Sequence, residues 1–182
     1  FGVIPCNTAH AYLEEICFSV NIPFLDMVQT TCRKAMSRVG TQGTIGILAT
    51  TGTLISELYP ASIKQLAPNT QTVTLLDLEN GEHLQQQLVM EPIFGEYGIK
   101  AGGFQDIDRK EQLAAPMRIA TKKLANAGAD IVLTACTEIP LVLGRKSVDN
   151  IPLLDPMEVA ANDTIEIALG RRSLPSLQRT DV

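Results

Sequence analysis

Two of the four cysteines in this sequence stand where a side chain could do chemistry. Cys6 and Cys136 each follow a short apolar run and precede small hydrogen-bonding residues. We expect each to lie between the end of a strand and the start of a helix, whose unpaired N–H groups and dipole favour a thiolate. Two thiols that face one ligand can divide proton transfer between them, with one as a thiolate base and the other as a thiol acid. Such a pair inverts a stereocentre, because the proton leaves one face and returns on the other.

The two cysteines also occupy equivalent positions in an internal repeat. The segment 2–8, GVIPCNT, resembles the segment 132–138, VLTACTE. Downstream, IPFLD at 22–26 is echoed by IPLLD at 151–155, and this second block begins 16 residues after the first cysteine and 15 after the second. Two matched blocks at nearly the same offset predict a duplicated α/β unit. Since ligands bind at the carboxyl ends of the strands in open α/β sheets, both cysteines are expected at a shared crevice.

Other interpretations of the cysteines stay open on this reasoning. A cysteine at a strand end is often a small buried hydrophobe, and Cys6 and Cys136 could form a redox pair if their separation allowed a disulfide. Cys17 and Cys32 lack comparable neighbours, and we interpret them as packing residues. The sequence holds no CxxC pair, P-loop or GxGxxG motif, so it predicts neither a metal site nor a nucleotide cofactor.

Small polar residues near these turns are the candidates for binding a ligand. They are Asn7, Thr8 and Thr137 beside the cysteines, and Thr50, Thr51 and Thr53 in a separate turn after an apolar run. The side chains and free N–H groups at the first set suit a carboxylate, whereas ordinary turn and N-cap chemistry explains the second set equally well. We expect His10 to pack rather than to react. Lys100 lies in a glycine-rich stretch, and composition alone predicts a solvated lysine there.

The elements that must position these residues alternate between strands and helices. Apolar runs predict strands over 44–50, 72–76, 130–135 and 151–154, and the chain begins as the last part of another. Helices are expected after Thr53 with a kink or break at Pro60, over 81–95, over 108–126 and from Met157 to Leu169. This alternation predicts an α/β fold of two pseudo-symmetric Rossmann-like lobes with parallel sheets. We assign residues 1–38 and 155–182 to the first lobe, which is incomplete, and residues 39–154 to the second.

The composition is that of an acidic globular protein. Of the 182 residues, 45% are hydrophobic and 19% are charged, and the formal net charge is −5. An acidic balance argues against a protein that binds the nucleic-acid backbone, and no apolar run approaches the roughly 18 residues of a membrane-spanning helix. We therefore expect a cytoplasmic protein with neither nucleic-acid nor membrane partners. Because the sequence begins at Phe1, without a methionine or a signal peptide, we also expect upstream residues to be absent from it.

Four motifs in this order resemble the aspartate/glutamate racemase superfamily, and its aspartate racemase branch in particular. They are the segments 6–10 (CNTAH), 47–53 (ILATTGT), 99–102 (IKAG) and 136–140 (CTEIP). The resemblance runs from Gly2 to about Leu169, nearly the whole chain. It implies two pseudo-symmetric α/β domains, no pyridoxal phosphate or metal, and two cysteines that act from opposite sides of Cα.

Carried over residue by residue, the resemblance implies that Cys6 and Cys136 are the acid/base pair. The substrate ligands that it implies are Asn7, Thr8, Thr50, Thr51, Thr53, Lys100, Thr137 and Glu138. Lys100 matches a lysine that helps to hold the side-chain carboxylate in aspartate-selective members. Glu138 stands where glutamate racemases typically have histidine, and this difference favours aspartate as the substrate.

The resemblance therefore implies a cofactor-independent isomerase that racemises a small acidic amino acid, and a homodimer, as members commonly are. A Gly-Gly-Met type loop that contributes substrate contacts in the family is not in this sequence. Four alternatives stay open: a glutamate racemase, a maleate isomerase, a hydantoin racemase, and a truncated homologue that binds a carboxylate without catalysis.

Overall fold

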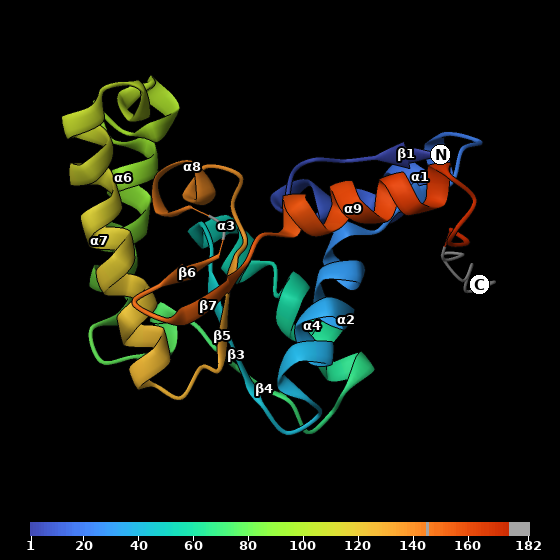
Figure 1. Cartoon of the computed structure of the whole chain (residues 1–182), viewed down its shortest axis with the longest axis horizontal. Coiled ribbons are helices and arrows are strands. Elements are labelled where there is room, and N and C mark those ends of the chain that lie inside the picture. The colour runs from blue at the N-terminus through green and yellow to red at the C-terminus, as the bar shows by residue number, and fades with distance from the viewer. Residues whose placement is uncertain (145, 175–182) are drawn as a thin grey trace.

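The computed structural model describes residues 1–144 and 146–174. Its centre is a five-stranded sheet in the order β4-β3-β5-β7-β6 (Figure 1). The strands are β3 (Thr44–Leu48), β4 (Gln71–Val73), β5 (Ile131–Thr134), β6 (Ser147–Val148) and β7 (Ile151–Leu154). All neighbours pair in parallel except β6, which runs antiparallel to β7 at one edge. Every residue of β5 is buried, as expected for a parallel strand covered on both faces.

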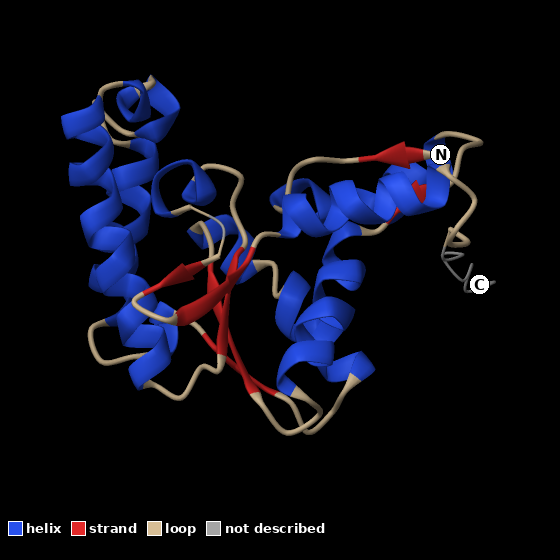
Figure 2. Cartoon of the chain, in the orientation of Figure 1, coloured by secondary structure: helices blue, strands red, loops and turns tan. Residues whose placement is uncertain are grey.

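Helices cover both faces of this sheet (Figure 2). One face carries α5 (Gly81–Gln85), a π-helical segment η3 (Gln86–Met90), α6 (Glu91–Phe94) and α7 (Ile107–Asn126), and the other carries α2 (Met27–Val39) and α4 (Leu58–Leu66). Met117 and Leu124 of α7 are fully buried in the first apolar cluster. Cys32 and Ile63 are fully or almost fully buried in the second, so the packing role predicted for Cys32 is confirmed.

Short elements occupy the turns around the sheet. They are α3 (Thr51–Ile55), α8 (Ile139–Leu143) and the 3₁₀ segments η2 (Leu75–Asp77), η4 (Ile99–Ala101) and η5 (Gly103–Gln105). The beginning of the chain forms β1 (Gly2–Val3), the 3₁₀ segment η1 (Thr8–Tyr12), α1 (Leu13–Ser19) and β2 (Phe24–Leu25). In Figure 1 these first elements lie with α9 (Pro156–Ala168), to the right of the five-stranded sheet.

The strand pairing reproduces the internal repeat in register. β1 and β2 pair in parallel with Val3 opposite Leu25, and β5 and β7 pair in parallel with Leu133 opposite Leu154. The sequence repeat aligns Val3 with Leu133 and Leu25 with Leu154. Each cysteine therefore follows the equivalent strand of a two-strand unit of the same geometry.

The helices that close the two units begin in the same way. Asp26 is the N-cap of α2, with Oδ1 accepting a hydrogen bond from the backbone N–H of Gln29 at 2.9 Å. Asp155 is the N-cap of α9, with Oδ1 accepting from the N–H of Met157 at 2.9 Å. Both helices contain 13 residues, and they pack against each other. The pattern IPxLD occurs twice in this chain, and each copy forms a strand followed by the N-cap of a helix.

Several elements differ from the sequence-based expectation. The helix after β3 is broken at Glu57, which has a left-handed φ of 51°, whereas Pro60 is accommodated within α4. The strand expected over 72–76 is β4 (Gln71–Val73), because Thr74 and Asp77 form a capping box that starts a 3₁₀ turn.

The division into lobes, 1–38 with 155–182 and 39–154, stays a prediction, and residues 175–182 lie outside the described part of the chain. Among the described residues, none of the helices has both the length and the apolar character that crossing a bilayer requires.

Candidate functional site

The Cys6 turn is held in place by a buried histidine. His10 is 5% exposed, and its Nδ1 lies 2.8 Å from the carbonyl oxygen of Cys6. Its Nε2 accepts the backbone N–H of Met27, the first residue of α2, at 3.2 Å. A ring whose Nε2 accepts must donate through Nδ1, so His10 is a neutral tautomer that ties the Cys6 turn to α2. The expected packing role of His10 is confirmed, while the Cys6 side chain itself is exposed.

Asn7 presents an amide donor that no described group satisfies. The residue is 3% exposed, and its Oδ1 accepts a 2.5 Å hydrogen bond from the hydroxyl of Tyr59. Its Nδ2 is buried and has no hydrogen-bond partner. Buried amide donors are rarely left unpaired in native proteins, so this atom suits an acceptor such as a carboxylate oxygen. Tyr59 was missed by the sequence reasoning, because a tyrosine within an amphipathic helix carries no signal beyond packing.

Three threonines join the Cys6 turn to the turn after β3. The hydroxyl of Thr8 lies 2.7 Å from that of Thr53, which lies 3.3 Å from that of Thr50. Thr53 is 2% exposed, so these hydroxyls form a largely buried chain. Thr51 contributes its backbone N–H to the sulfur of Met90 at 3.4 Å. The predicted residues Thr8, Thr50 and Thr53 are thus brought together, and Thr51 belongs to the same turn.

The turn after β5 carries a second cluster of predicted residues. Glu138 is its centre: Oε2 accepts hydrogen bonds from the thiol of Cys136 at 2.9 Å and from the hydroxyl of Thr137 at 2.8 Å. Its other oxygen, Oε1, forms an ion pair with Nζ of Lys100 at 2.6 Å. Lys100 also lies over the ring of Phe94, 5.4 Å from its centroid. Lys100 is therefore ion-paired with Glu138, and not merely solvated as the composition alone predicts.

The sheet places the two clusters at one edge. β3 and β5 are neighbouring parallel strands in which Leu48 is opposite Thr134, and the N–H of Ala135 donates to the carbonyl of Leu48 at 2.8 Å. Thr50 lies two residues after Leu48, and Cys136 lies two residues after Thr134. Both turns therefore leave the same carboxyl end of the sheet. Ligands bind at this edge in open α/β sheets.

Electrostatics also connect both cysteines with Lys100. The hydrogen bond to Glu138 is the largest cause that raises the pKa of Lys100, and the charge of Glu138, with that of Cys136 or Cys6 when either is ionised, acts in the same direction. The ammonium group of Lys100 is therefore within electrostatic range of both cysteine turns. No direct contact joins Cys6 to Cys136 among the described residues, and no disulfide links them.

The environment of Cys136 opposes the thiolate that its place before a helix predicts. Burial, followed by the hydrogen bond to Glu138, raises the pKa of Cys136 from 9.0 to about 12. Burial alone would raise the pKa of Glu138, but the hydrogen bonds from Cys136, Lys100 and Thr137 outweigh it and lower the pKa to about 2. Cys136 is therefore a thiol and Glu138 a carboxylate near neutral pH. Glu138 is also the N-cap residue of α8, and Thr137 donates to its carboxylate.

In the described part of the chain, no three or more His, Cys, Asp and Glu residues are grouped so that they could hold a metal ion. The groups gathered at the sheet edge can instead accept or donate protons at sulfur and bind carboxylates. The thiols, the hydroxyls and the amide lie at turns that lead from strands to helices, whereas the ammonium group of Lys100 comes from η4, between α6 and α7.

Curated relatives of this chain are racemases. It is 28% identical over 172 residues to a glutamate racemase of Geobacter metallireducens, covering 92% of this chain and 56% of that protein. It is 27% identical over 180 residues to a broad-specificity amino-acid racemase of Bacillus subtilis, covering 95% of this chain and 66% of that protein. The chain thus spans about half to two-thirds of the length of these relatives.

Solved structures share the fold. A putative Asp/Glu racemase from Yersinia pestis aligns with a TM-score of 0.70 at 22% identity, over 92% of this chain and 65% of that one. An aspartate racemase homologue from Pyrococcus horikoshii aligns with a TM-score of 0.65 at 21% identity, over 92% of this chain and 66% of that one. The family model for Asp/Glu/Hydantoin racemases matches residues 1–164. With a repeat that sets one cysteine turn in each unit and a match over most of its length, the chain belongs to the Asp/Glu/Hydantoin racemase family.

Proposed function

We propose that this protein racemises a small acidic amino acid, with aspartate as the favoured substrate, and that Cys6 and Cys136 exchange the Cα proton without a cofactor. One observation carries the proposal: the Cys6 turn, through the 2.7 Å contact of Thr8 with Thr53, and the Cys136 turn, with Glu138 and Lys100, lie at one edge of the sheet. A cation near both thiols can hold an anionic substrate where each thiol approaches one face of Cα. Family membership supports the reaction class, because the curated relatives named above are racemases.

Hydrogen-bond donors that could bind the α-carboxylate of the substrate lie on the Cys6 side of the site. The buried Nδ2 of Asn7 lacks a partner, and Thr8 and Thr53 offer hydroxyls in a shared hydrogen bond. Donors already fixed in place stabilise the charge that develops on the carboxylate as the α-proton leaves. The α-proton is only weakly acidic, so this support and close placement of the thiol must supply most of the reduction in barrier.

The surroundings of Cys136 decide which thiol begins a turnover as the acid. Because burial and Glu138 raise the pKa of Cys136 to about 12, this residue starts as the thiol acid. The proposed exchange then requires Cys6, whose side chain is exposed, as the thiolate base for one enantiomer. The α-proton moves to the sulfur of Cys6, and the proton of Cys136 moves to the opposite face of Cα. For the other enantiomer the two roles are exchanged.

Lys100 supports the preference for aspartate. In the free protein its ammonium group is paired with Glu138 at 2.6 Å, and a substrate side-chain carboxylate would share or replace that contact. Glu138 stands at the position where the resemblance expects histidine in glutamate racemases. We also expect a homodimer, which light scattering would test.

The experiment compares substrates first. D- and L-aspartate, D- and L-glutamate, maleate and one enantiomer of a hydantoin are incubated with the protein after dialysis. Racemisation of the chiral compounds is followed by circular dichroism, and conversion of maleate to its achiral isomer fumarate is followed by ultraviolet absorbance. In deuterated water, both enantiomers of the true substrate should gain solvent deuterium at Cα. Isomerisation of maleate or racemisation of the hydantoin, without racemisation of either amino acid, would contradict the proposal. Calorimetric binding of aspartate without turnover would instead indicate a carboxylate-binding homologue.

The roles of the thiols are tested separately. Cys6→Ser and Cys136→Ser should each abolish racemisation, because a serine hydroxyl is a far weaker acid than a thiol. Cys17→Ser is the matched control, since Cys17 lies in α1 away from both turns, and it should keep its activity. Full activity in either of the first two variants would remove that residue from proton transfer.

A further inference from the structure

A cavity that shares no residue with the candidate site lies between α2 and α9. Its volume is about 560 Å³, within the usual range of small-molecule pockets. α9 packs against α2 and lies across its upper part in Figure 1. The cavity also reaches the end of β7 and the residue before β6. Since none of the predicted site residues lines it, the proposed racemisation gives this cavity no role.

One wall of the cavity is basic. Arg33, Lys34 and Arg38 of α2 line it, together with Lys146. Lys34 and Arg38, four positions apart, are neighbours on one face of α2, and Arg33 borders the same cavity. All four side chains are exposed, so they are accessible at the rim. Within the described part of the chain, none of the four forms an ion pair.

The floor of the cavity is apolar. Leu153 and Leu154 of β7 and Val159 of α9 line it, and each is at most 8% exposed. Asn162, which is exposed, adds an amide on the α9 side. The cavity thus offers a charged rim, a buried apolar surface and a polar wall, which together fit a ligand with an anionic end and an organic body.

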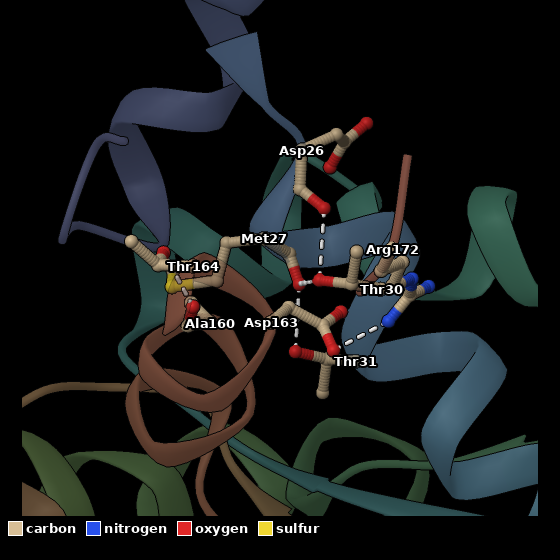
Figure 3. A network of polar contacts seen from close by, with 8 residues as sticks. All are labelled: Asp26, Met27, Thr30, Thr31, Ala160, Asp163, Thr164 and Arg172. Carbon is tan, nitrogen blue, oxygen red and sulfur yellow. Dashed lines mark hydrogen bonds and ion pairs between the residues drawn. The ribbon is translucent and has the colours of Figure 1, made fainter. Parts of the chain in front are cut away.

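The acidic residues of the cavity do not cancel this charge. Asp163 is already paired with Arg172, and Figure 3 shows the two beside Thr30, which also lines the cavity. Asp155 caps α9 through Oδ1. Five cations, the four named above and Arg172, thus line the cavity against three carboxylates, Asp155, Glu158 and Asp163. In a protein of net charge −5, a cleft lined by cations concentrates anions by focusing the field.

We propose that this cavity binds a small organic phosphate, with the phosphate on Arg33, Arg38 and Lys146 and the organic body over the leucines of β7. Two guanidinium groups and an ammonium group match a doubly charged group with three acceptor oxygens better than a single carboxylate. The proposal is independent of the racemase function, because it uses none of its residues.

The test is direct binding by isothermal titration calorimetry, with AMP and ribose 5-phosphate as probes and adenosine and ribose as the matched compounds without phosphate. Both phosphates should bind with dissociation constants below about 1 mM, and the unphosphorylated compounds should bind at least tenfold more weakly. Binding should weaken as salt is added, because exposed charges are screened.

Variants identify the place of binding. Arg33→Ala combined with Arg38→Ala should weaken binding of AMP by roughly tenfold or more. Lys64→Ala combined with Lys110→Ala removes the same charge from α4 and α7, outside the cavity, and should leave binding unchanged. Lys146→Ala, which alters no helix, is a second variant should the first fail to fold by circular dichroism.

Three results would overturn the proposal. They are no binding of either phosphate, equal binding of adenosine and AMP, and binding that neither the α2 variant nor Lys146→Ala weakens. None of these results depends on racemase activity, because calorimetry measures binding at the cavity whether or not the protein racemises an amino acid.

Discussion

The carboxylate of Glu138 should control the protonation of Cys136, and Glu138→Gln tests this directly. The substitution keeps the size of the side chain and removes its charge. In the protein, Oε2 of Glu138 accepts the thiol hydrogen at 2.9 Å, while Oε1 neutralises Lys100 at 2.6 Å. The variant therefore removes a negative charge beside the sulfur and frees a nearby positive charge. Both effects stabilise the thiolate and lower the pKa of Cys136.

The size of the effect follows from the pKa of Cys136. It is raised from 9.0 to about 12, which corresponds to about 4 kcal/mol in favour of the thiol at roughly 1.4 kcal/mol per unit. Burial is the largest cause and is unchanged by the substitution. We therefore assign about a third of the total to Glu138, and expect the pKa of Cys136 to fall by about one unit. At a given pH below this pKa, the thiolate fraction of Cys136 should rise about tenfold.

Alkylation measures this fraction at the residue itself. The protein is treated briefly with iodoacetamide between pH 7 and about pH 11, below the pKa of Cys136, where the labelling rate rises in proportion to its thiolate fraction. The peptide that carries Cys136 is then quantified by mass spectrometry. Because the thiolate is the nucleophile, the pH profile of labelling reports the pKa of Cys136, and Cys32 in the same sample serves as an internal buried reference.

A matched substitution guards against a general change in charge. Glu111→Gln also removes a carboxylate from an ion pair, that with Arg118, but does so on the exposed surface of α7. It should leave the labelling of Cys136 unchanged. If Glu138→Gln leaves the profile where it is, or shifts it to higher pH, then Glu138 does not hold the proton on Cys136 and the reasoning is wrong.

Three further predictions concern the elements that hold the site. Tyr59→Phe removes the hydroxyl that donates to Asn7 and leaves a buried acceptor unpaired, so the free energy of unfolding should fall by about 1–3 kcal/mol; urea denaturation measures it, and a change of less than about 0.5 kcal/mol would show that the hydrogen bond contributes little. Asp26→Ala removes the N-cap of α2 and should lower the free energy of unfolding by about 1 kcal/mol in the same assay. Asp26→Asn, which keeps a capping oxygen, should retain most of this stability. If Asp26→Ala is as stable as the wild type, the cap does not stabilise the protein. The pKa of Glu138 is lowered from 4.5 to about 2, so its contribution to stability is present above about pH 4.5 and is lost as the pH falls towards 2; acid unfolding curves of wild type and Glu138→Gln should therefore converge below pH 4.5, and a constant difference down to pH 2 would contradict the lowered pKa.

The repeat in the sequence was the most informative guide to the fold. Its two blocks predicted that strand, cysteine turn, second strand and helix recur, and the registers Val3–Leu25 and Leu133–Leu154 confirm this pairing. Local composition misplaced smaller features. The break at Glu57 depends on one residue in a left-handed conformation, and glutamate carries no preference that announces it. Proline at position 60 was the stronger local signal, but the first turn of a helix tolerates proline.

For the site, the alternation of strands and helices predicted that turns at the carboxyl ends of strands gather at one edge, but not the ionisation within these turns. The shared crevice expected for Cys6 and Cys136 stays a prediction. Adjacent parallel strands bring Thr50 and Cys136 to one edge, and this follows from alternating strands and helices. The contact between Lys100 and Glu138 joins residues 38 positions apart, and sequence alone does not give the path of the loop that carries Lys100. Burial depends on the whole fold, so the raised pKa of Cys136 could not be predicted from its place before a helix.

A duplicated unit would be expected to give its two cysteines equal properties, yet their surroundings differ. Cys6 is exposed in a turn fixed by a neutral histidine, whereas Cys136 is buried and donates to a carboxylate. If both act on one substrate, this difference assigns the resting proton to Cys136 before any ligand arrives. Substrate that draws Lys100 away from Glu138 would strengthen the hold of Glu138 on that proton, because the carboxylate would lose its compensating cation. The enantiomer that needs Cys136 as acid should then bind to the resting form directly, and its mirror image should require a proton shift first. Initial rates for the two enantiomers should therefore depend differently on pH, with the slower direction rising more steeply towards alkaline pH.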